Sequence, residues 1–262
     1  ESNAIGTTSI VRQPINMDRT GSKPITASPA LGEHTESILE RLGYSVNEID
    51  KLRESSLNTM ESLRDSADYI DTHNQSIQPW LERDSAMENL VDDDRIYGIG
   101  EILCGNDFWL DGTEGHLRVG DTDWHGGDTS FPTDLSWIKI AIYLDPLTKD
   151  DGCLRVIPGT HVLMDPDPYV SLRGPSTETY FGVSPDQIPS VSLETNPGDV
   201  IIFTEQLIHG AFGGGVGRHQ ICVNFVGDLK TDEQVNFVRN FYQKTNSSVR
   251  PTRTYVNSDR PR

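Results

Sequence analysis

Long apolar runs are missing from this chain of 262 residues. A membrane-spanning helix needs about 18 or more consecutive apolar residues, and no such run occurs. The first residues, Glu1 to Ile5, lack the basic segment and the apolar core of a secretory signal peptide. We therefore expect neither a membrane span nor a targeting segment.

Cysteine is scarce as well. The three cysteines, Cys104, Cys153 and Cys222, lie in apolar runs, and none forms a Cys-x-x-Cys pair. This usage is typical neither of a secreted disulfide framework nor of a thiolate metal knuckle. We interpret the three thiols as reduced core residues and expect a cytoplasmic protein.

Positive charge is also in short supply. Lysine and arginine number 22 against 40 aspartates and glutamates, so the formal net charge is −18. Nucleic acids and anionic membranes attract basic surfaces, because their own phosphates are negative. The balance therefore disfavours both as partners, and it leaves the oligomeric state open.

The N-terminal part predicts two helices. Residues 29–43 form a short apolar-faced segment that ends at Gly43, a residue suited to the left-handed conformation of a helix end. Ser45 and Glu48 form a capping box, which starts a second helix with an apolar stripe that includes Ile49 and Leu52.

Within residues 10–54, the segments Pro-Ala-Leu-Gly-Glu-His-Thr and Glu-Ile-Asp-Lys-Leu-Arg resemble the C-terminal tail of class III (CaiB/BaiF) CoA-transferases. The catalytic aspartate of that family lies in a part that this chain lacks, so transferase activity is not implied. The resemblance predicts an N-terminal extension over residues 1–54 and a separate domain over residues 55–262.

From residue 96 onward the sequence changes to short β-rich runs separated by Gly, Pro, Asp and Asn. The expected strands cover residues 96–104, 116–119, 137–144, 153–157, 199–203 and 220–226. A helix is expected at residues 232–242. Many short strands with few helices predict a mainly β fold, either a sandwich or a jelly roll.

Three points in this β-rich part suggest chemistry. His125 is followed closely by Asp128, His209 comes 84 residues later, and Arg218 comes nine residues after that. Two histidines and one carboxylate can bind iron(II) and leave coordination positions open. A guanidinium can grip a carboxylate in bidentate fashion.

The surrounding motifs resemble the phytanoyl-CoA dioxygenase-like branch of the iron(II)/2-oxoglutarate oxygenases, over about residues 60–240. The matching pieces are Trp124-His125, the strand-turn-strand segment of residues 140–161 ending in Ile-Pro-Gly-Thr-His, the segment 197–203, and His209-Gly210. The resemblance implies a double-stranded β-helix (cupin-like jelly roll) core with flanking N-terminal helices.

The same resemblance implies an enzyme, a dioxygenase that hydroxylates an unactivated C–H bond of a small-molecule substrate while 2-oxoglutarate is decarboxylated to succinate. Its iron(II) would be held by His125, Asp128 and His209, and its co-substrate 2-oxoglutarate by Arg218. Dioxygen is the second co-substrate. The substrate itself is not implied.

One departure from the family motif leaves alternatives. The family has His-x-Asp, whereas here Gly127 takes the expected carboxylate position and Asp128 follows one residue later. Asp128 can be the ligand, because Gly126 and Gly127 give the backbone unusual freedom. The gap can instead admit a halide, as in the related halogenases, or Asp121 or Asp123 can be the third ligand. A cupin-like metal-binding module without redox turnover is a further alternative.

Some side chains stay unassigned at this level. Lys139 and Arg155 lie in expected strands, but the face of a strand residue depends on the pairing register. We interpret His116 as a structural residue or as one that supports a metal ligand through a hydrogen bond.

Overall fold

The computed structural model describes residues 44–63, 74–118, 120–127, 132, 134–162, 167–172, 182–214 and 218–244. The chain divides into two compact units, residues 1–44 and 45–262. All of the helices and strands below belong to the second unit. The expected helix over residues 29–43 lies outside the described residues.

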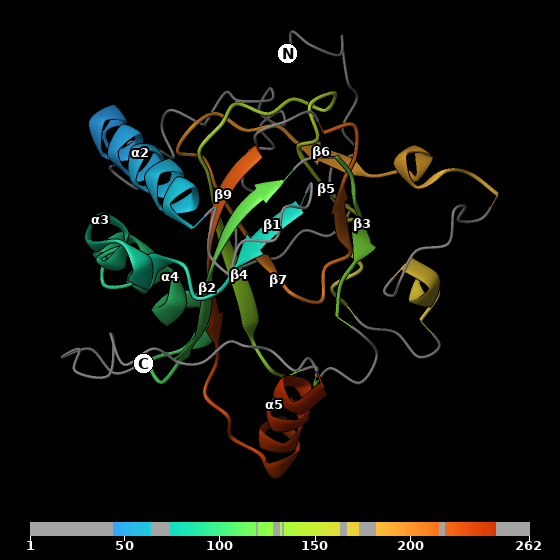
Figure 1. Cartoon of the computed structure of the whole chain (residues 1–262). Coiled ribbons are helices and arrows are strands. Elements are labelled where there is room, and N and C mark those ends of the chain that lie inside the picture. Colours follow the sequence, from blue (N-terminus) through green and yellow to red (C-terminus); the bar gives the residue numbers. More distant parts are fainter. Residues whose placement is uncertain are drawn as a thin grey trace, which may run out of the picture. The chain divides into compact units, whose positions relative to one another are not determined.

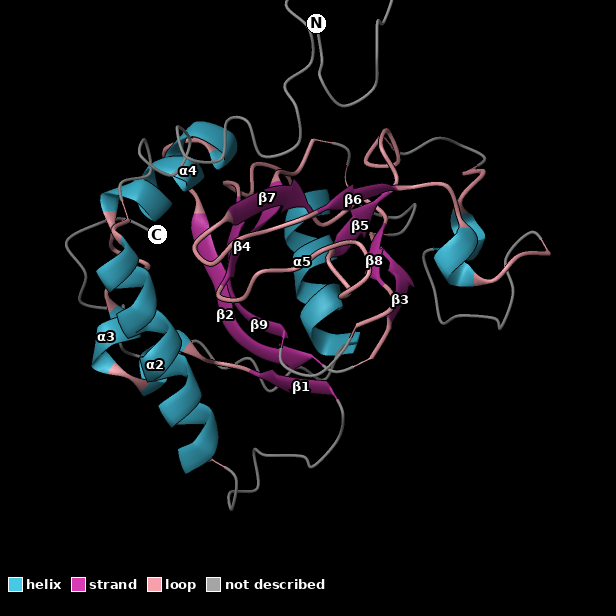
Figure 2. Cartoon of the chain, turned by 90° about the horizontal axis from the view of Figure 1, so that it is seen from above, coloured by secondary structure: helices cyan, strands magenta, loops and turns pink. Residues whose placement is uncertain are grey.

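Two antiparallel sheets face each other in this unit (Figures 1 and 2). The larger sheet has the order β1-β2-β9-β4-β7, and the smaller one has the order β3-β8-β5-β6. The strands of the larger sheet are β1 (Asn74–Ile77), β2 (Trp109–Arg118), β9 (Arg218–Val226), β4 (Trp137–Tyr143) and β7 (Val200–Thr204). The strands of the smaller sheet are β3 (Thr122–His125), β8 (His209–Ala211), β5 (Leu154–Val156) and β6 (Val191–Leu193). This is the expected mainly β, jelly-roll architecture, and the predicted fold class is confirmed.

Helices flank the sheets. Besides the short 3-10 helices η1 (Leu81–Arg83), η2 (Val170–Leu172) and η3 (Pro185–Gln187), they are α2 (Val46–Ser62), α3 (Ser85–Glu88), α4 (Asp94–Cys104) and α5 (Asp232–Lys244). No helix in the described part of the chain combines the length and the apolarity that crossing a bilayer demands.

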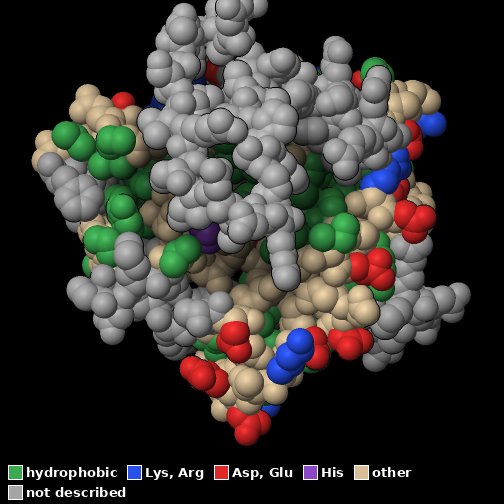
Figure 3. Space-filling model, turned by 180° about the vertical axis from the view of Figure 1, so that it is seen from behind, with side chains coloured by type: hydrophobic (Ala, Val, Ile, Leu, Met, Phe, Trp, Pro, Cys, Tyr) green, Lys and Arg blue, Asp and Glu red, His purple; other side chains and the backbone are tan. Residues whose placement is uncertain are grey.

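Helix α5 lies at one end of the space between the sheets, below the strands in Figure 1 and behind that space in Figure 2. Its Phe237 and Phe241 stand edge-on to the Trp137 ring at the start of β4, and Val238 is buried in the same cluster. The opposite face of the helix carries Asp232 and other polar residues. Acidic side chains gather at this lower end in the view from behind (Figure 3).

Most expected strands are observed, but the one over residues 96–104 is wrong. This segment is helix α4, and Asp93 caps it by accepting from the backbone N–H of Arg95. The buried residues Ile96, Tyr97 and Gly100 recur at helical spacing, so they form a single face. Gly100 allows the Phe108 ring to approach, since a Cβ there would lie 2.7 Å from that ring.

Helix α2 is part of the second unit. The predicted capping box is present, with the Ser45 side chain and the Glu48 side chain each accepting from the other's backbone N–H. Ile49 and Leu52 are buried, and Arg53 forms a 2.7 Å ion pair with Asp145. The helix therefore runs through residue 54, where the resemblance places the domain boundary, and that boundary remains a prediction.

The strand register decides which side chains face the interior. Glu114 of β2 lies opposite Cys222 of β9, and Lys139 of β4 lies opposite Asn224 of β9. Side chains two apart on a strand share a face, so His116 lies on the same face as Glu114. The interior face of the larger sheet is therefore polar and charged.

Candidate active site

The two predicted histidine ligands are paired across two short strands. Strands β3 and β8 are antiparallel neighbours, and His125 lies opposite His209 in their register. The ring centroids are 4.1 Å apart. His209 is buried, and His125 is more exposed. Backbone pairing thus brings together two imidazoles that are 84 residues apart in the sequence.

Each imidazole is held through its Nδ1 atom. His125 Nδ1 lies 2.7 Å from the carbonyl oxygen of Asp123, and His209 Nδ1 lies 2.8 Å from that of Leu207. A carbonyl oxygen only accepts, so Nδ1 carries the proton and Nε2 keeps its lone pair. Burial, followed by the neighbouring His125, lowers the pKa of His209 well below its usual range. A neutral imidazole oriented in this way is the form that binds a transition metal.

Gly126 and Gly127, which follow His125, lie against the segment that leads into His209. A Cβ on Gly126 would lie 3.0 Å from the carbonyl oxygen of Leu207 and 3.2 Å from Cα of Ile208. The backbone N–H of Gly127 donates to the carbonyl oxygen of Glu205 at 2.7 Å. Glycine at position 126 therefore permits a close backbone approach to the segment that leads into His209.

Both histidines line a cavity that is open to solvent, with an empty space of about 590 Å³ when the solvent at its mouth is included. The larger sheet supplies a polar wall made of Glu114, His116, Lys139, Tyr143, Arg218 and Gln220. Apolar side chains line another part of the cavity, namely Leu147, Leu154, Phe203 and Ala211. The Phe203 ring packs edge-on against His209, with centroids 4.7 Å apart. The space suits a small polar ligand and a partly apolar one beside it.

Arg218 begins β9 and lines the same cavity. Its side chain is buried, and its Nη1 and Nη2 groups donate to the carbonyl oxygens of Gly152 and Gly120. A Cβ at Gly214 would lie 2.9 Å from the Arg218 Nε, so a glycine there leaves room for the guanidinium. Two backbone carbonyls thus fix a buried cation in a cavity that also holds the two imidazole rings.

The structure also places the residues that the sequence left unassigned. Lys139 faces the cavity, where its ammonium is 3.2 Å from Glu114 and 3.4 Å from Glu205. Arg155 does not line it, and donates instead to the carbonyl oxygen of Asp186. His116, interpreted from the sequence as structural or as supporting a metal ligand, lines the cavity. Its Nε2 lies 2.7 Å from Glu114. These cavity residues could be found only once the register was known.

The structure describes two of the three aspartates that the sequence offers as the third ligand, Asp121 and Asp123. Asp121 accepts from the backbone N–H of Gly213 at 2.7 Å, and neither it nor Asp123 lines the cavity. Asp128 lies outside the described residues. Among the described residues that line the cavity, Glu114 supplies a carboxylate.

Residues 111–218 match the family model described as phytanoyl-CoA dioxygenase (PhyH). The predicted resemblance to this family is confirmed. A curated relative, the probable phytanoyl-CoA dioxygenase of Caenorhabditis elegans, is 36% identical over 72 residues. That match covers 26% of this chain and 23% of the relative, so the chain spans about a quarter of the relative's length.

Solved structures share the fold of this chain at low identity. HygX from Streptomyces hygroscopicus, solved with nickel and 2-oxoglutarate, is 17% identical with a TM-score of 0.56, over 78% of this chain and 90% of its own. EctD from S. alaskensis with bound Fe is 19% identical with a TM-score of 0.54, over 71% and 70%. SnoN, the α-ketoglutarate-dependent epimerase of nogalamycin biosynthesis, is 18% identical with a TM-score of 0.53, over 73% and 84%.

Proposed function

We propose that this protein is an iron(II)- and 2-oxoglutarate-dependent dioxygenase that hydroxylates a C–H bond of a small-molecule substrate. The observation that supports this most directly is the pair of imidazoles at β3 and β8, each anchored through Nδ1 and set in one cavity with a buried arginine. That donor set suits a metal with open coordination positions and a dicarboxylate co-substrate.

In this proposal His125, Asp128 and His209 hold the iron, and Arg218 binds the far carboxylate of 2-oxoglutarate. Iron(II), when bound, supplies dioxygen activation coupled to decarboxylation of 2-oxoglutarate to succinate. The chain's own contribution is orientation and exclusion of water. The fixed guanidinium of Arg218 orients the co-substrate, while Phe203 and Leu154 keep part of the cavity apolar.

Asp128 remains the proposed third ligand. It follows Gly127, whose backbone hydrogen bond to Glu205 keeps the chain beside the segment that leads to His209. The halogenase alternative is not favoured, because the matching family model and the curated relative are both dioxygenases by description. The experiment below distinguishes this dioxygenase from a cupin-like metal-binding module without redox turnover.

The decisive experiment is anaerobic titration of iron(II) and 2-oxoglutarate, followed by admission of oxygen with measurement of oxygen uptake and succinate. The wild type should develop the visible charge-transfer absorption of 2-oxoglutarate chelated to iron and then form succinate. His209→Ala and Asp128→Ala should each lose the band, whereas His161→Ala, an exposed histidine, should keep it. Absorption without any succinate formation would instead indicate a binding module.

The arginine assignment is tested by the same titration. Arg218→Ala should weaken 2-oxoglutarate binding by about 30-fold or more, because removing one partner of a buried charge pair costs about 2–5 kcal/mol. Its iron affinity should change little. Arg155→Ala, which removes a guanidinium outside the cavity, serves as the matched control. Equal 2-oxoglutarate affinity in the two variants would refute the role of Arg218.

A further inference from the structure

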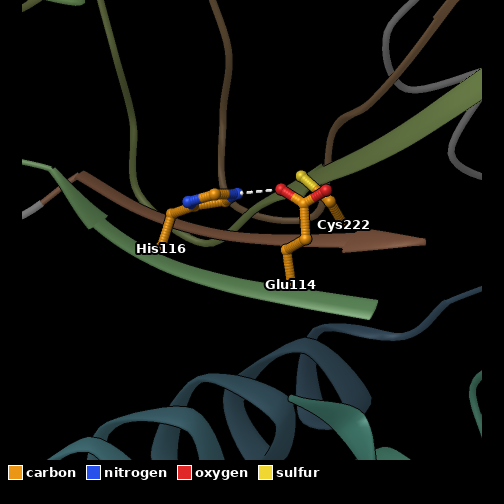
Figure 4. A group of neighbouring side chains, drawn as sticks. All are labelled: Glu114, His116 and Cys222. Atoms are coloured by element: carbon orange, nitrogen blue, oxygen red, sulfur yellow. Dashed lines mark hydrogen bonds and ion pairs between the residues drawn. The ribbon is translucent and has the colours of Figure 1, made fainter. Parts of the chain in front are cut away.

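A second group of metal-binding side chains lies in the polar wall of the cavity. Glu114, His116 and Cys222, hereafter the Glu114 cluster, are all buried, and their ligand atoms lie within 4.8 Å of one another. Figure 4 shows the His116 ring and the Cys222 sulfur both beside the Glu114 carboxylate. None of the three is used in the function proposed above.

Strand register places these residues together. Glu114 and Cys222 are direct cross-strand partners on β2 and β9, and His116 is two residues along β2 on the same face. Sites built on paired strands hold their ligands more precisely than sites on loops. Glu114 and His116 also line the cavity, which gives an ion a path from solvent.

Two neighbouring side chains form hydrogen bonds to the ligand atoms of the Glu114 cluster. The side-chain amide of Gln220 donates to the Cys222 sulfur at 3.1 Å, and the amide of Asn224 donates to the Glu114 carboxylate. Hydrogen bonds of this kind orient ligand atoms and stabilise a thiolate. The cluster therefore has ligands, orienting partners and access to solvent.

The carboxylates paired beside the cluster favour a dication. Glu114 and Glu205 share the ammonium of Lys139, so these three paired side chains have a net charge of −1. A divalent ion that displaces the Cys222 thiol proton adds two positive charges and one negative charge, and the net charge becomes zero. Lys139 need not lose its partner, because Glu205 already lies 3.4 Å away. Excess buried charge is costly, so this neutralisation favours binding.

We propose that the Glu114 cluster is a second metal site, selective for a thiolate-accepting divalent ion such as zinc(II). A thiolate, an imidazole and a carboxylate form a ligand set that zinc accepts, whereas the two-histidine site at β3 and β8 suits iron(II). On binding, the thiol of Cys222 releases its proton to solvent and a bond forms between sulfur and metal. The His116 proton, which Nε2 donates to Glu114 in the metal-free protein, moves through solvent to Nδ1, and the Nε2 lone pair then faces the metal. No oxidation or reduction occurs.

The test uses cobalt(II) as a spectroscopic probe on the whole, metal-free chain. The wild type should show the near-ultraviolet charge-transfer band of a cobalt thiolate, and Cys222→Ser should lose it. Cys153→Ser, another buried cysteine of the same core, should keep it. His209→Ala should also keep it, so failure of the proposed iron site cannot be mistaken for failure of this one.

A measurement on the zinc-loaded wild type does not depend on whether the variants fold. Zinc-edge X-ray absorption of the zinc-loaded wild type should show one sulfur neighbour at about 2.3 Å. Binding should strengthen as pH rises, since the ion competes with the thiol proton. A wild type without a thiolate band, a band that survives in Cys222→Ser, or a zinc shell without sulfur would each overturn the proposal.

Discussion

The ion pair between Glu114 and Lys139 allows a quantitative test that is independent of any activity. Glu114 has a side chain that is 9% exposed, and it accepts from Lys139, His116 and Asn224. Removing one partner of a buried pair costs about 3–5 kcal/mol, whereas removing both is often close to neutral. Lys139 keeps Glu205 as a second carboxylate, so Glu114→Gln should cost about 3 kcal/mol, at the lower end of that range.

Lys139→Met should cost a similar amount, because it leaves the Glu114 carboxylate buried without its lysine partner. The double variant should be no less stable than either single one, which gives a coupling of about 3 kcal/mol. At about 2–4 °C per kcal/mol, each single variant should melt about 6–12 °C below the wild type. The assay is urea and thermal unfolding at pH 7 with a chelator present, so that metal does not contribute.

The stability that Glu114 contributes decreases as the pH falls. Burial alone would raise the pKa of Glu114. The charge of Lys139, the hydrogen bond and charge of His116, and the hydrogen bond from Asn224 outweigh it and hold that pKa well below its ordinary value. The resulting stability is present above the unfolded-state pKa of about 4.3 and is lost as pH falls toward the folded-state pKa. Glu114→Gln should lose this part of the slope. Single variants costing under about 1 kcal/mol, or strictly additive effects, would refute the reasoning.

Three further outcomes are expected. Gly115→Ala should destabilise the fold by about 1–3 kcal/mol in urea unfolding, because its Cβ would lie 2.1 Å from the buried Trp80 ring; Gly98→Ala, with open space, should not. Asp145→Asn should loosen helix α2 by breaking the pair with Arg53, which hydrogen exchange of the helix amides measures. Gly126→Ala should weaken iron(II) binding without loss of the fold, as titration and circular dichroism can show.

Much of the fold could be predicted from β-branched runs, but the exceptions have physical causes. Residues 96–104 alternate apolar and small residues well enough to resemble a strand, and only their burial at helical spacing reveals α4. Strands β1, β3, β6 and β8 are not among the expected strands, because three or four residues are too few to show a period. Strand β5 is as short, but it lies within the longer apolar run of residues 153–157.

The residues of the candidate site also divide into those that the sequence predicts and those that need the strand register. His125, His209 and Arg218 were found from motif and spacing, and the structure brings them to one cavity. Lys139 and His116 were not, because the face of a strand residue follows from pairing with distant strands, which no local pattern encodes.

The pairing of His125 with His209 has an evolutionary consequence. The distance between the two rings is set by one cross-strand pair, not by the length of chain that joins them. Insertions and deletions in the connecting chain can therefore reshape what surrounds a substrate while the two imidazoles keep their separation. The geometry of the imidazole pair and the surroundings of the cavity become separately variable, which suits a fold that this chain shares with SnoN, HygX and EctD at under 20% identity.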